Sequence, residues 1–80
     1  MISINFIEAL RAALDWTNDY SVVIRDKYLA KQWDDGEQLN ECRLFFLDEI
    51  SKVVIDRELC ALIIYFDVDG VYTIHRQGVF

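Results

Sequence analysis

Two aspartates separated by one residue are the part of this sequence best placed to do chemistry. Asp67 and Asp69 come directly after the apolar run Cys60–Phe66. Carboxylates so close together could bind a divalent cation, because Mg²⁺ and Ca²⁺ prefer oxygen ligands. A calcium loop that began at Asp67 would need Gly at its sixth position and Glu at its twelfth, but Tyr72 and Gly78 stand there. We therefore predict no specific metal site.

The segment Leu62–Val71 resembles the first motif of the haloacid dehalogenase superfamily, in which an apolar strand ends in Asp-x-Asp-Gly. The resemblance implies that Asp67 is a phosphoryl-accepting nucleophile and Asp69 a general acid/base, with Mg²⁺ bridging the site. The family also needs a Ser or Thr, a Lys and further acids downstream, whereas ten residues follow Gly70 here. We interpret Asp67–Gly70 as a hairpin turn instead, because Asp and Gly readily adopt turn dihedrals.

The other reactive side chains stand alone in the sequence. His75 is the single histidine, and no Ser or Cys is placed beside it as a catalytic dyad requires. Cys42 and Cys60 lack CxxC spacing and are expected to be reduced, small core residues. The longest apolar run is far shorter than the ~20 residues that span a bilayer. We predict a cytoplasmic, non-enzymatic protein with no catalytic residues, no cofactor and no membrane contact.

Negative charge is concentrated after residue 33. The formal charge of the 80-residue chain is -6, and residues 1–33 hold four acids and four bases. Ten acids and four bases follow from Asp34 onward. Such a chain repels phosphate backbones and is attracted to basic protein surfaces. The candidate partner-binding residues are Asp34, Asp35, Glu37, Glu41, Asp48 and Glu49.

The elements that must position these acids are clearest at the two ends of the chain. Helical spacing predicts a helix over residues 5–17, with Asn5 as its N-cap. Residues 20–24 are rich in β-branched side chains and predict a strand that continues toward Trp33. A turn is expected at 34–36, and residues 61–75 predict a β-hairpin that turns at Asp69-Gly70. The fold class is α+β, with the N-terminal helix packed on a small antiparallel sheet.

Residues 39–56 allow two interpretations. As a helix they would place Glu41, Asp48 and Glu49 near one stripe, while as strands they would give 44–47 and 53–55. We favour the helix, because no Gly or Pro occurs between Gln38 and Phe66. The whole chain, 1–80, is expected to form a single domain, since 54% of its residues are apolar and 80 residues suffice for one core.

A second resemblance involves the middle of the chain. Residues 28–30, 34–36 and 43–50 are similar to the later strands of WYL-type domains, which are small Sm-like barrels in bacterial regulators. The resemblance implies a β-barrel over residues 20–76 that binds a ligand or nucleic acid. The family carries Arg where this chain has Glu49, and the family's upstream Pro-Leu-Gly segment is missing.

Charge and size together favour a binding protein over an enzyme. We expect a small acidic inhibitor of a nucleic-acid-handling protein, of the phage anti-defence or toxin-immunity type, whose partner presents a basic surface. Direct nucleic-acid binding is not expected. The alternative is a Sm-like or WYL-like regulatory or assembly module, and a homo-oligomer is compatible with either function.

Overall fold

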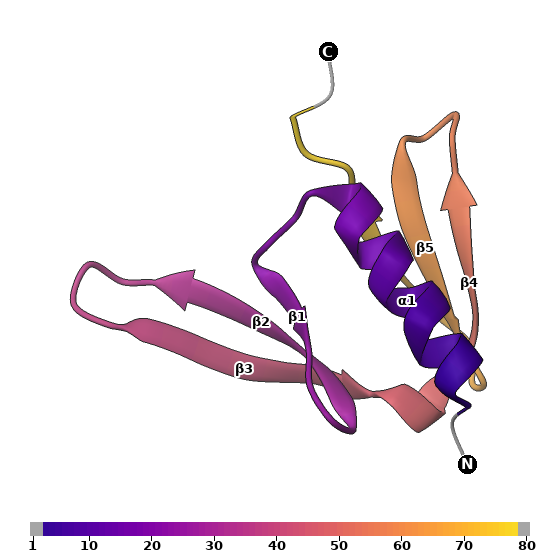
Figure 1. Ribbon diagram of the computed structural model, residues 1–80, viewed down its shortest axis with the longest axis horizontal. Coiled ribbons are helices and arrows are strands. Elements are labelled where there is room, and N and C mark those ends of the chain that lie inside the picture. The colour runs from indigo at the N-terminus through magenta and orange to yellow at the C-terminus, as the bar shows by residue number, and fades with distance from the viewer. Residues whose placement is uncertain (1–2, 79–80) are drawn as a thin grey trace.

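The computed structural model describes residues 3–78, which form one helix and two three-stranded antiparallel sheets in an α+β arrangement (Figure 1). The elements are α1 (Ile4–Thr17), β1 (Val22–Ile24), β2 (Tyr28–Asp34), β3 (Leu39–Phe46), the 3-10 turn η1 (Leu47–Glu49), β4 (Ile50–Asp56), β5 (Ala61–Phe66) and β6 (Val71–His75). Sheet A has the order β1-β2-β3 and sheet B the order β4-β5-β6. The α+β class is confirmed, while the barrel over residues 20–76 that the WYL-type resemblance implies is not formed, because the strands make two separate sheets.

The helix is where the apolar spacing placed it, but its cap is different. The Ser3 hydroxyl accepts a hydrogen bond from the Phe6 amide at 3.1 Å, so Ser3 rather than Asn5 caps the first turn. The helix ends at Asn18, which adopts a left-handed conformation and returns its N–H to the Asp15 carbonyl. The buried side of the helix carries Leu10, Ala13, Leu14 and Thr17.

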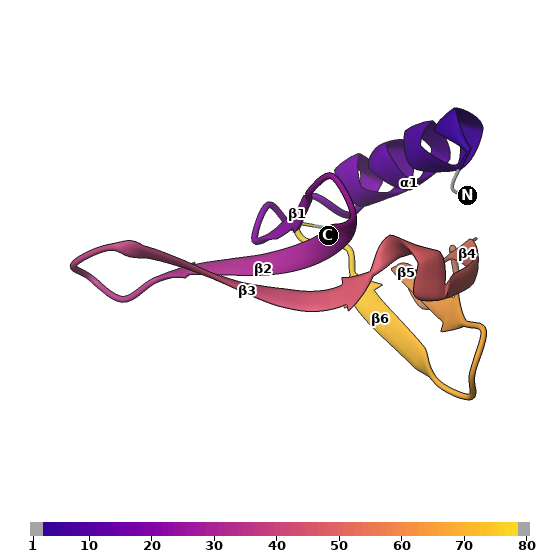
Figure 2. The same ribbon diagram turned by 90° about the horizontal axis from the view of Figure 1, so that it is seen from below.

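Sheet A contains a β2–β3 hairpin that extends beyond its short edge strand, β1. The predicted strand from residue 20 toward Trp33 is two strands, because the charged sequence Arg25-Asp26-Lys27 forms a turn in which Arg25 N–H bonds to Tyr28 at 2.8 Å. β1 pairs with β2 only over residues 29–31. Beyond that point β2 and β3 continue as a two-stranded arm, residues 33–40, which extends away from α1 (Figures 1 and 2). The predicted turn at residues 34–36 forms its tip, with Gly36 at a φ of 94°.

The favoured helix over residues 39–56 is wrong, and the strand alternative is confirmed in outline. β3 pairs with β2 along its length, and β4 pairs with β5. A helix would have put Arg43 on the same stripe as Phe46 and Ile50, whereas the observed strands bury Phe45 and Ile50, and η1 buries Leu47. No glycine is needed to separate the strands, because the single 3-10 turn of η1 changes the chain direction between them.

Sheet B contains the predicted C-terminal hairpin and supports the helix. β5 is the central strand, and the turn between β5 and β6 contains Gly70 at a φ of 127°. The core joins one side of α1 to the inner side of sheet B and the base of sheet A (Figure 1). Its buried members are Leu10, Ala13, Leu14, Val22, Leu29, Phe45, Leu47, Ile50, Leu62, Ile64 and Ile74.

Candidate partner-binding surface

The six predicted partner-binding carboxylates do not share one face. Asp34, Asp35 and Glu37 lie at the tip of the arm, and Glu41 lies farther along β3. Asp48 and Glu49 lie in η1, at the other end of β3. Eight strand residues at ~3.3 Å per residue separate the two ends by roughly 26 Å. The acidic stripe inferred for a helix therefore does not exist, and the two ends of β3 have to be judged separately.

Two of the three carboxylates at the tip hold the turn of the arm together. The Asp34 carboxylate accepts a hydrogen bond from the Gly36 amide at 2.8 Å. One oxygen of Asp35 accepts from the amides of Glu37 and Gln38, at 2.9 and 3.0 Å, and the other accepts from the Asn40 side chain at 2.9 Å. The Asn40 bond, followed by the two amide bonds, lowers the pKa of Asp35 below its usual range. These two side chains have a structural role.

Glu41 also has internal partners. Its carboxylate forms an ion pair with the Arg25 guanidinium and accepts a hydrogen bond from the Gln32 amide group at 3.0 Å. The Arg25 bond, and after it the Gln32 bond, lowers the pKa of Glu41. This is the one ion pair in residues 3–78. Glu41 therefore braces the base of the arm and is a poor candidate for contact with another protein.

The other end of β3 opens into an apolar hollow with an acidic rim. We call it the aromatic hollow, and its volume is about 600 Å³. The Asp67 amide bonds to the Glu49 carbonyl at 2.9 Å and so brings the β5–β6 turn next to η1. The lining residues are Leu44, Phe45, Asp48, Glu49, Phe66, Asp67, Val68 and Tyr72.

Three aromatic rings give the aromatic hollow its fixed shape. The Phe45 ring meets the Phe66 ring edge to face at 4.8 Å and the Tyr72 ring at 5.5 Å. Such aromatic pairs add about 0.5–1.5 kcal/mol beyond the area that they bury. Because Phe45 also belongs to the buried core, the floor of the hollow is continuous with the packing that holds α1 on the sheets. The site is therefore preformed.

The rim of the aromatic hollow carries one sign of charge. Its lining includes three acids and no base. Within residues 3–78 the carboxylates of Asp48 and Asp67 have neither a hydrogen-bond partner nor an ion pair, and the Glu49 carboxylate accepts one bond, from the Phe46 amide at 3.3 Å. Most of this negative charge is therefore available to a cation that enters the hollow.

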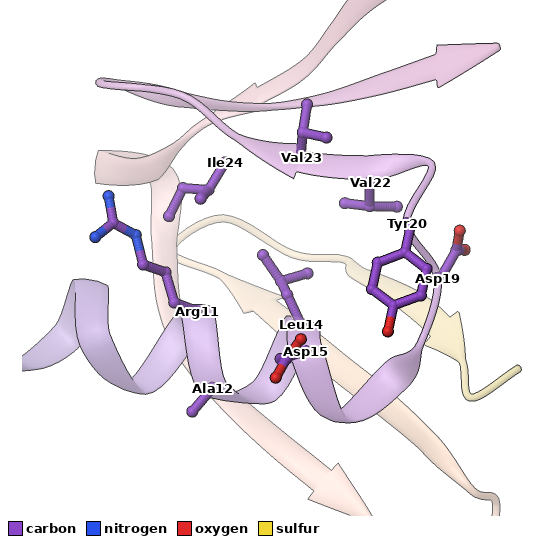
Figure 3. A pocket seen from close by; sticks show the side chains of 9 residues that line it. All are labelled: Arg11, Ala12, Leu14, Asp15, Asp19, Tyr20, Val22, Val23 and Ile24. Atoms are coloured by element: carbon purple, nitrogen blue, oxygen red, sulfur yellow. The ribbon is translucent and has the colours of Figure 1, made fainter. Parts of the chain in front are cut away.

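A second hollow, of about 550 Å³, separates α1 from β1 (Figure 3). Arg11 lies at one end, and Asp15, Asp19 and Tyr20 lie toward the other. The Asp19 carboxylate already accepts bonds from the amide and hydroxyl of Ser21. The rim of this hollow carries both a base and acids, and one of the acids already accepts internal hydrogen bonds. The hollow therefore favours neither a cationic nor an anionic ligand.

The side chains considered for catalysis lie apart from one another. Asp67 and Asp69 lie in the β5–β6 turn, as predicted, and His75 is exposed at the end of β6. Cys42 and Cys60 are free thiols, but the expectation that both are core residues is wrong. Cys42 is exposed on β3, and Cys60 is half-buried at a φ of 54°, where it completes the turn into β5.

The residues that sequence reasoning missed are Asp67, as part of the acidic rim, and the aromatic floor of the hollow. The available signal was a repeated pattern, since Phe45-Phe46-Leu47-Asp48-Glu49 and Tyr65-Phe66-Asp67 both pass from aromatic residues to acids at the end of a strand. Nothing in the sequence shows that these two strand ends meet. That information lies in the pairing of β4, β5 and β6.

Three broader observations complete the description of the site. In the part of the chain that the structure describes, no three His, Cys, Asp or Glu side chains converge as a metal would require. No helix among residues 3–78 has the length and apolar character needed to cross a membrane. No family model, curated protein or solved structure matches this chain.

Proposed function

We propose that this chain is a protein-binding protein whose aromatic hollow receives a basic segment of a partner protein. The observation that supports this function is the combination of an aromatic floor with a rim of three acids and no base. Apolar burial supplies most of the affinity in protein interfaces, while charge complementarity supplies orientation and association rate. The hollow offers both within one site.

The partner segment best suited to this site carries an Arg or Lys next to an apolar side chain. A guanidinium over an aromatic face contributes about 0.5–2 kcal/mol, and a planar guanidinium can also pair with a carboxylate through two hydrogen bonds. An exposed ion pair alone contributes about 0–1 kcal/mol. The apolar neighbour is therefore needed for measurable affinity, and the acids decide which apolar segment is accepted.

The partner class follows from the same electrostatics. A chain of formal charge -6 is steered toward basic surfaces, and proteins that handle nucleic acids commonly present such surfaces. We therefore place this chain among inhibitors of nucleic-acid-handling proteins, of the anti-defence or toxin-immunity type, acting in the cytoplasm. It would compete with nucleic acid for a basic segment of the partner.

A defined peptide tests this proposal. We would titrate the ¹⁵N-labelled chain with a hexapeptide of alternating Leu and Arg, and with its Leu/Glu counterpart as a control. The Leu/Arg peptide is expected to shift the amide resonances of Leu44, Asp48 and Asp67, with half-saturation on the order of 1 mM because only one site is filled. The Leu/Glu peptide should leave them unchanged.

A pair of charge-matched triple variants locates the binding site. Asp48→Asn/Glu49→Gln/Asp67→Asn removes the acidic rim, whereas Glu8→Gln/Asp26→Asn/Glu58→Gln removes three exposed acids elsewhere, and both change the formal charge from -6 to -3. The rim variant should weaken Leu/Arg binding at least about fivefold and flatten its salt dependence, while the control keeps the affinity. Equal weakening in both variants would reduce the effect to net charge and remove the hollow from the proposal.

The regulatory-module alternative would use the same hollow for a small ligand. Its volume of about 600 Å³ lies in the range of small-molecule sites, which is about 300–1,000 Å³. The acidic rim then favours a cationic ligand. Titration with N-acetyl-arginine amide separates the two functions, because tighter binding of this small molecule than of the Leu/Arg peptide would favour the ligand site.

A further inference from the structure

The side of sheet B that faces away from α1 is a second interaction surface. Side chains alternate along each strand, and directly paired residues share a face. The pairing in sheet B therefore places nine residues on this outer face, in three rows across the strands. The rows are Lys52-Tyr65-Val71, Val54-Ile63-Thr73 and Asp56-Ala61-His75.

The middle of the outer face is apolar and open. Val54 is 38% exposed and Val71 is 54% exposed, although both are aliphatic. Ile63 and Tyr65 lie on the central strand and are only half-buried. None of these four residues belongs to the core cluster, which lies on the α1 side of the sheet. The outer face thus combines strand regularity with unused apolar surface.

The two ends of the outer face carry opposite charges and opposite shapes. Lys52 and the large Tyr65 occupy the first row, with the Lys52 ammonium 4.8 Å from the centre of the Tyr65 ring. Asp56 and the small Ala61, which neighbouring side chains cover completely, occupy the third row. One Asp56 oxygen accepts a hydrogen bond from the Leu59 amide at 3.0 Å, and the other has no partner in residues 3–78. A surface with this layout is complementary to itself when it is turned end over end.

We propose that the outer face of sheet B binds a second copy of this chain, with the strands of the two copies antiparallel. A two-fold axis across the strands and through Ile63 places Lys52 opposite Asp56 of the second copy and Tyr65 opposite its Ala61. Ile63 then meets its own equivalent. Aligned sheet packing, with inner faces ~10 Å apart, accommodates this arrangement.

The charge and shape patterns select this orientation over the other two-fold arrangement. An axis along the strands would set Tyr65 against Tyr65, which crowds the first row. It would also set Lys52 against Val71, so the ammonium would lose its acidic partner. The parallel orientation therefore crowds the two Tyr65 rings, while the antiparallel orientation pairs Lys52 with Asp56.

The expected dimer is weak. Three strands spaced by ~4.8 Å and about seven residues long give a footprint of roughly 330 Å² per copy, below the ~800 Å² of a standard interface. Each copy also carries a formal charge of -6, so the copies repel one another at long range. We expect a dissociation constant on the order of 100 µM, and a tighter dimer as salt screens the repulsion.

Sedimentation equilibrium from 10 µM to about 1 mM protein, at low and high NaCl, tests the proposal. The wild-type chain is expected to dimerise reversibly and more tightly at high salt. Ile63→Lys should weaken the dimer at least about tenfold, because it puts two ammonium groups at the centre. Leu39→Lys makes the same charge change at an exposed position on the arm and should keep the dimer.

A charge swap shows whether a loss of dimer comes from the interface or from misfolding of the variant. Lys52→Glu alone should weaken the dimer, and Lys52→Glu/Asp56→Lys should restore it, because the opposite charges meet again. A chain that stays monomeric at 1 mM, or a swap that fails to rescue a folded single variant, would overturn the proposal. The rim variant of the aromatic hollow should dimerise normally. Absence of the dimer therefore leaves the proposed peptide binding intact, and absence of peptide binding leaves the dimer intact.

Discussion

The two ends of β3 carry similar numbers of acids but use them differently. At the tip of the arm, Asp34 and Asp35 accept hydrogen bonds from the turn that they belong to. At the other end, Asp48 and Asp67 edge an aromatic floor and have no partner in residues 3–78. The carboxylates at the tip stabilise the backbone of their own turn, while those at the other end remain available to a cation from outside the chain.

This difference shows why charge counts alone are poor guides to binding sites. A carboxylate with several donors around it is already solvated by the protein and gains little from a new cation. A carboxylate without donors exchanges water for that cation at lower cost, above all beside an apolar surface that excludes water. Net charge draws a partner near, but unengaged acids beside apolar residues decide where it binds.

The largest expected contrast concerns apolar side chains at the two ends. Phe45 is 9% exposed and contacts two other rings, whereas Trp33 on the arm is 50% exposed. Phe45→Ala should lower the free energy of unfolding by about 3 kcal/mol, and Trp33→Ala by less than about 1 kcal/mol. Urea denaturation measures both. Equal losses would mean that the arm is as much a part of the core as the aromatic floor is.

A smaller effect is expected at the base of the arm. Arg25→Gln removes the first cause of the lowered Glu41 pKa, so that pKa should rise toward its usual 4.5. A lowered carboxylate pKa stabilises the fold above the unfolded pKa, and this contribution is lost as pH falls through the folded pKa. Carboxyl ¹³C shifts followed from pH 6 to pH 2 report the midpoint. Arg11→Gln serves as the control. A Glu41 titration midpoint that stays the same in Arg25→Gln would contradict the stabilising role assigned to the Arg25–Glu41 ion pair.

The smallest effect is expected at the tip. Asn40→Ala removes the strongest bond to Asp35, so the pKa of Asp35 should rise toward 3.8. The amides of Glu37 and Gln38 should exchange with solvent severalfold faster, because the turn opens more often. The global midpoint of thermal unfolding should change little. A large drop in that midpoint would show that the arm and the body unfold as one unit.

The parts of the fold that could be predicted from sequence were those with local signals. The spacing of Leu10, Leu14 and Thr17 defined the buried side of α1, and Asp69-Gly70 marked the hairpin that was confirmed. Residues 39–56 were misassigned because their apolar residues fit both periods and η1 contains neither Gly nor Pro. Pairing with other strands makes this segment extended, since β2 and β5 provide the hydrogen-bond partners of its backbone.

The candidate site was predictable only in fragments. Asp48 and Glu49 were named from charge alone, while Asp67 was assigned only to a turn. Their proximity depends on the bond from the Asp67 amide to the Glu49 carbonyl, which joins segments that are far apart in sequence. Asp34 and Asp35 lie in the predicted turn and accept mostly from its own amides, whereas the hairpin register brings the Arg25 and Gln32 donors to Glu41.

The order of strands in the two sheets also has a consequence for how the chain folds. Every strand pair joins consecutive strands, so each sheet can zip up from its own turns with short loop closures. The helix is different, because Leu10 and Leu14 are buried in the same core as Leu62 and Ile64, which are synthesised much later. At about 5–20 residues per second, the apolar stripe of α1 stays exposed for seconds during synthesis. Its docking is then the late, long-range step that completes the core shared by the two sheets.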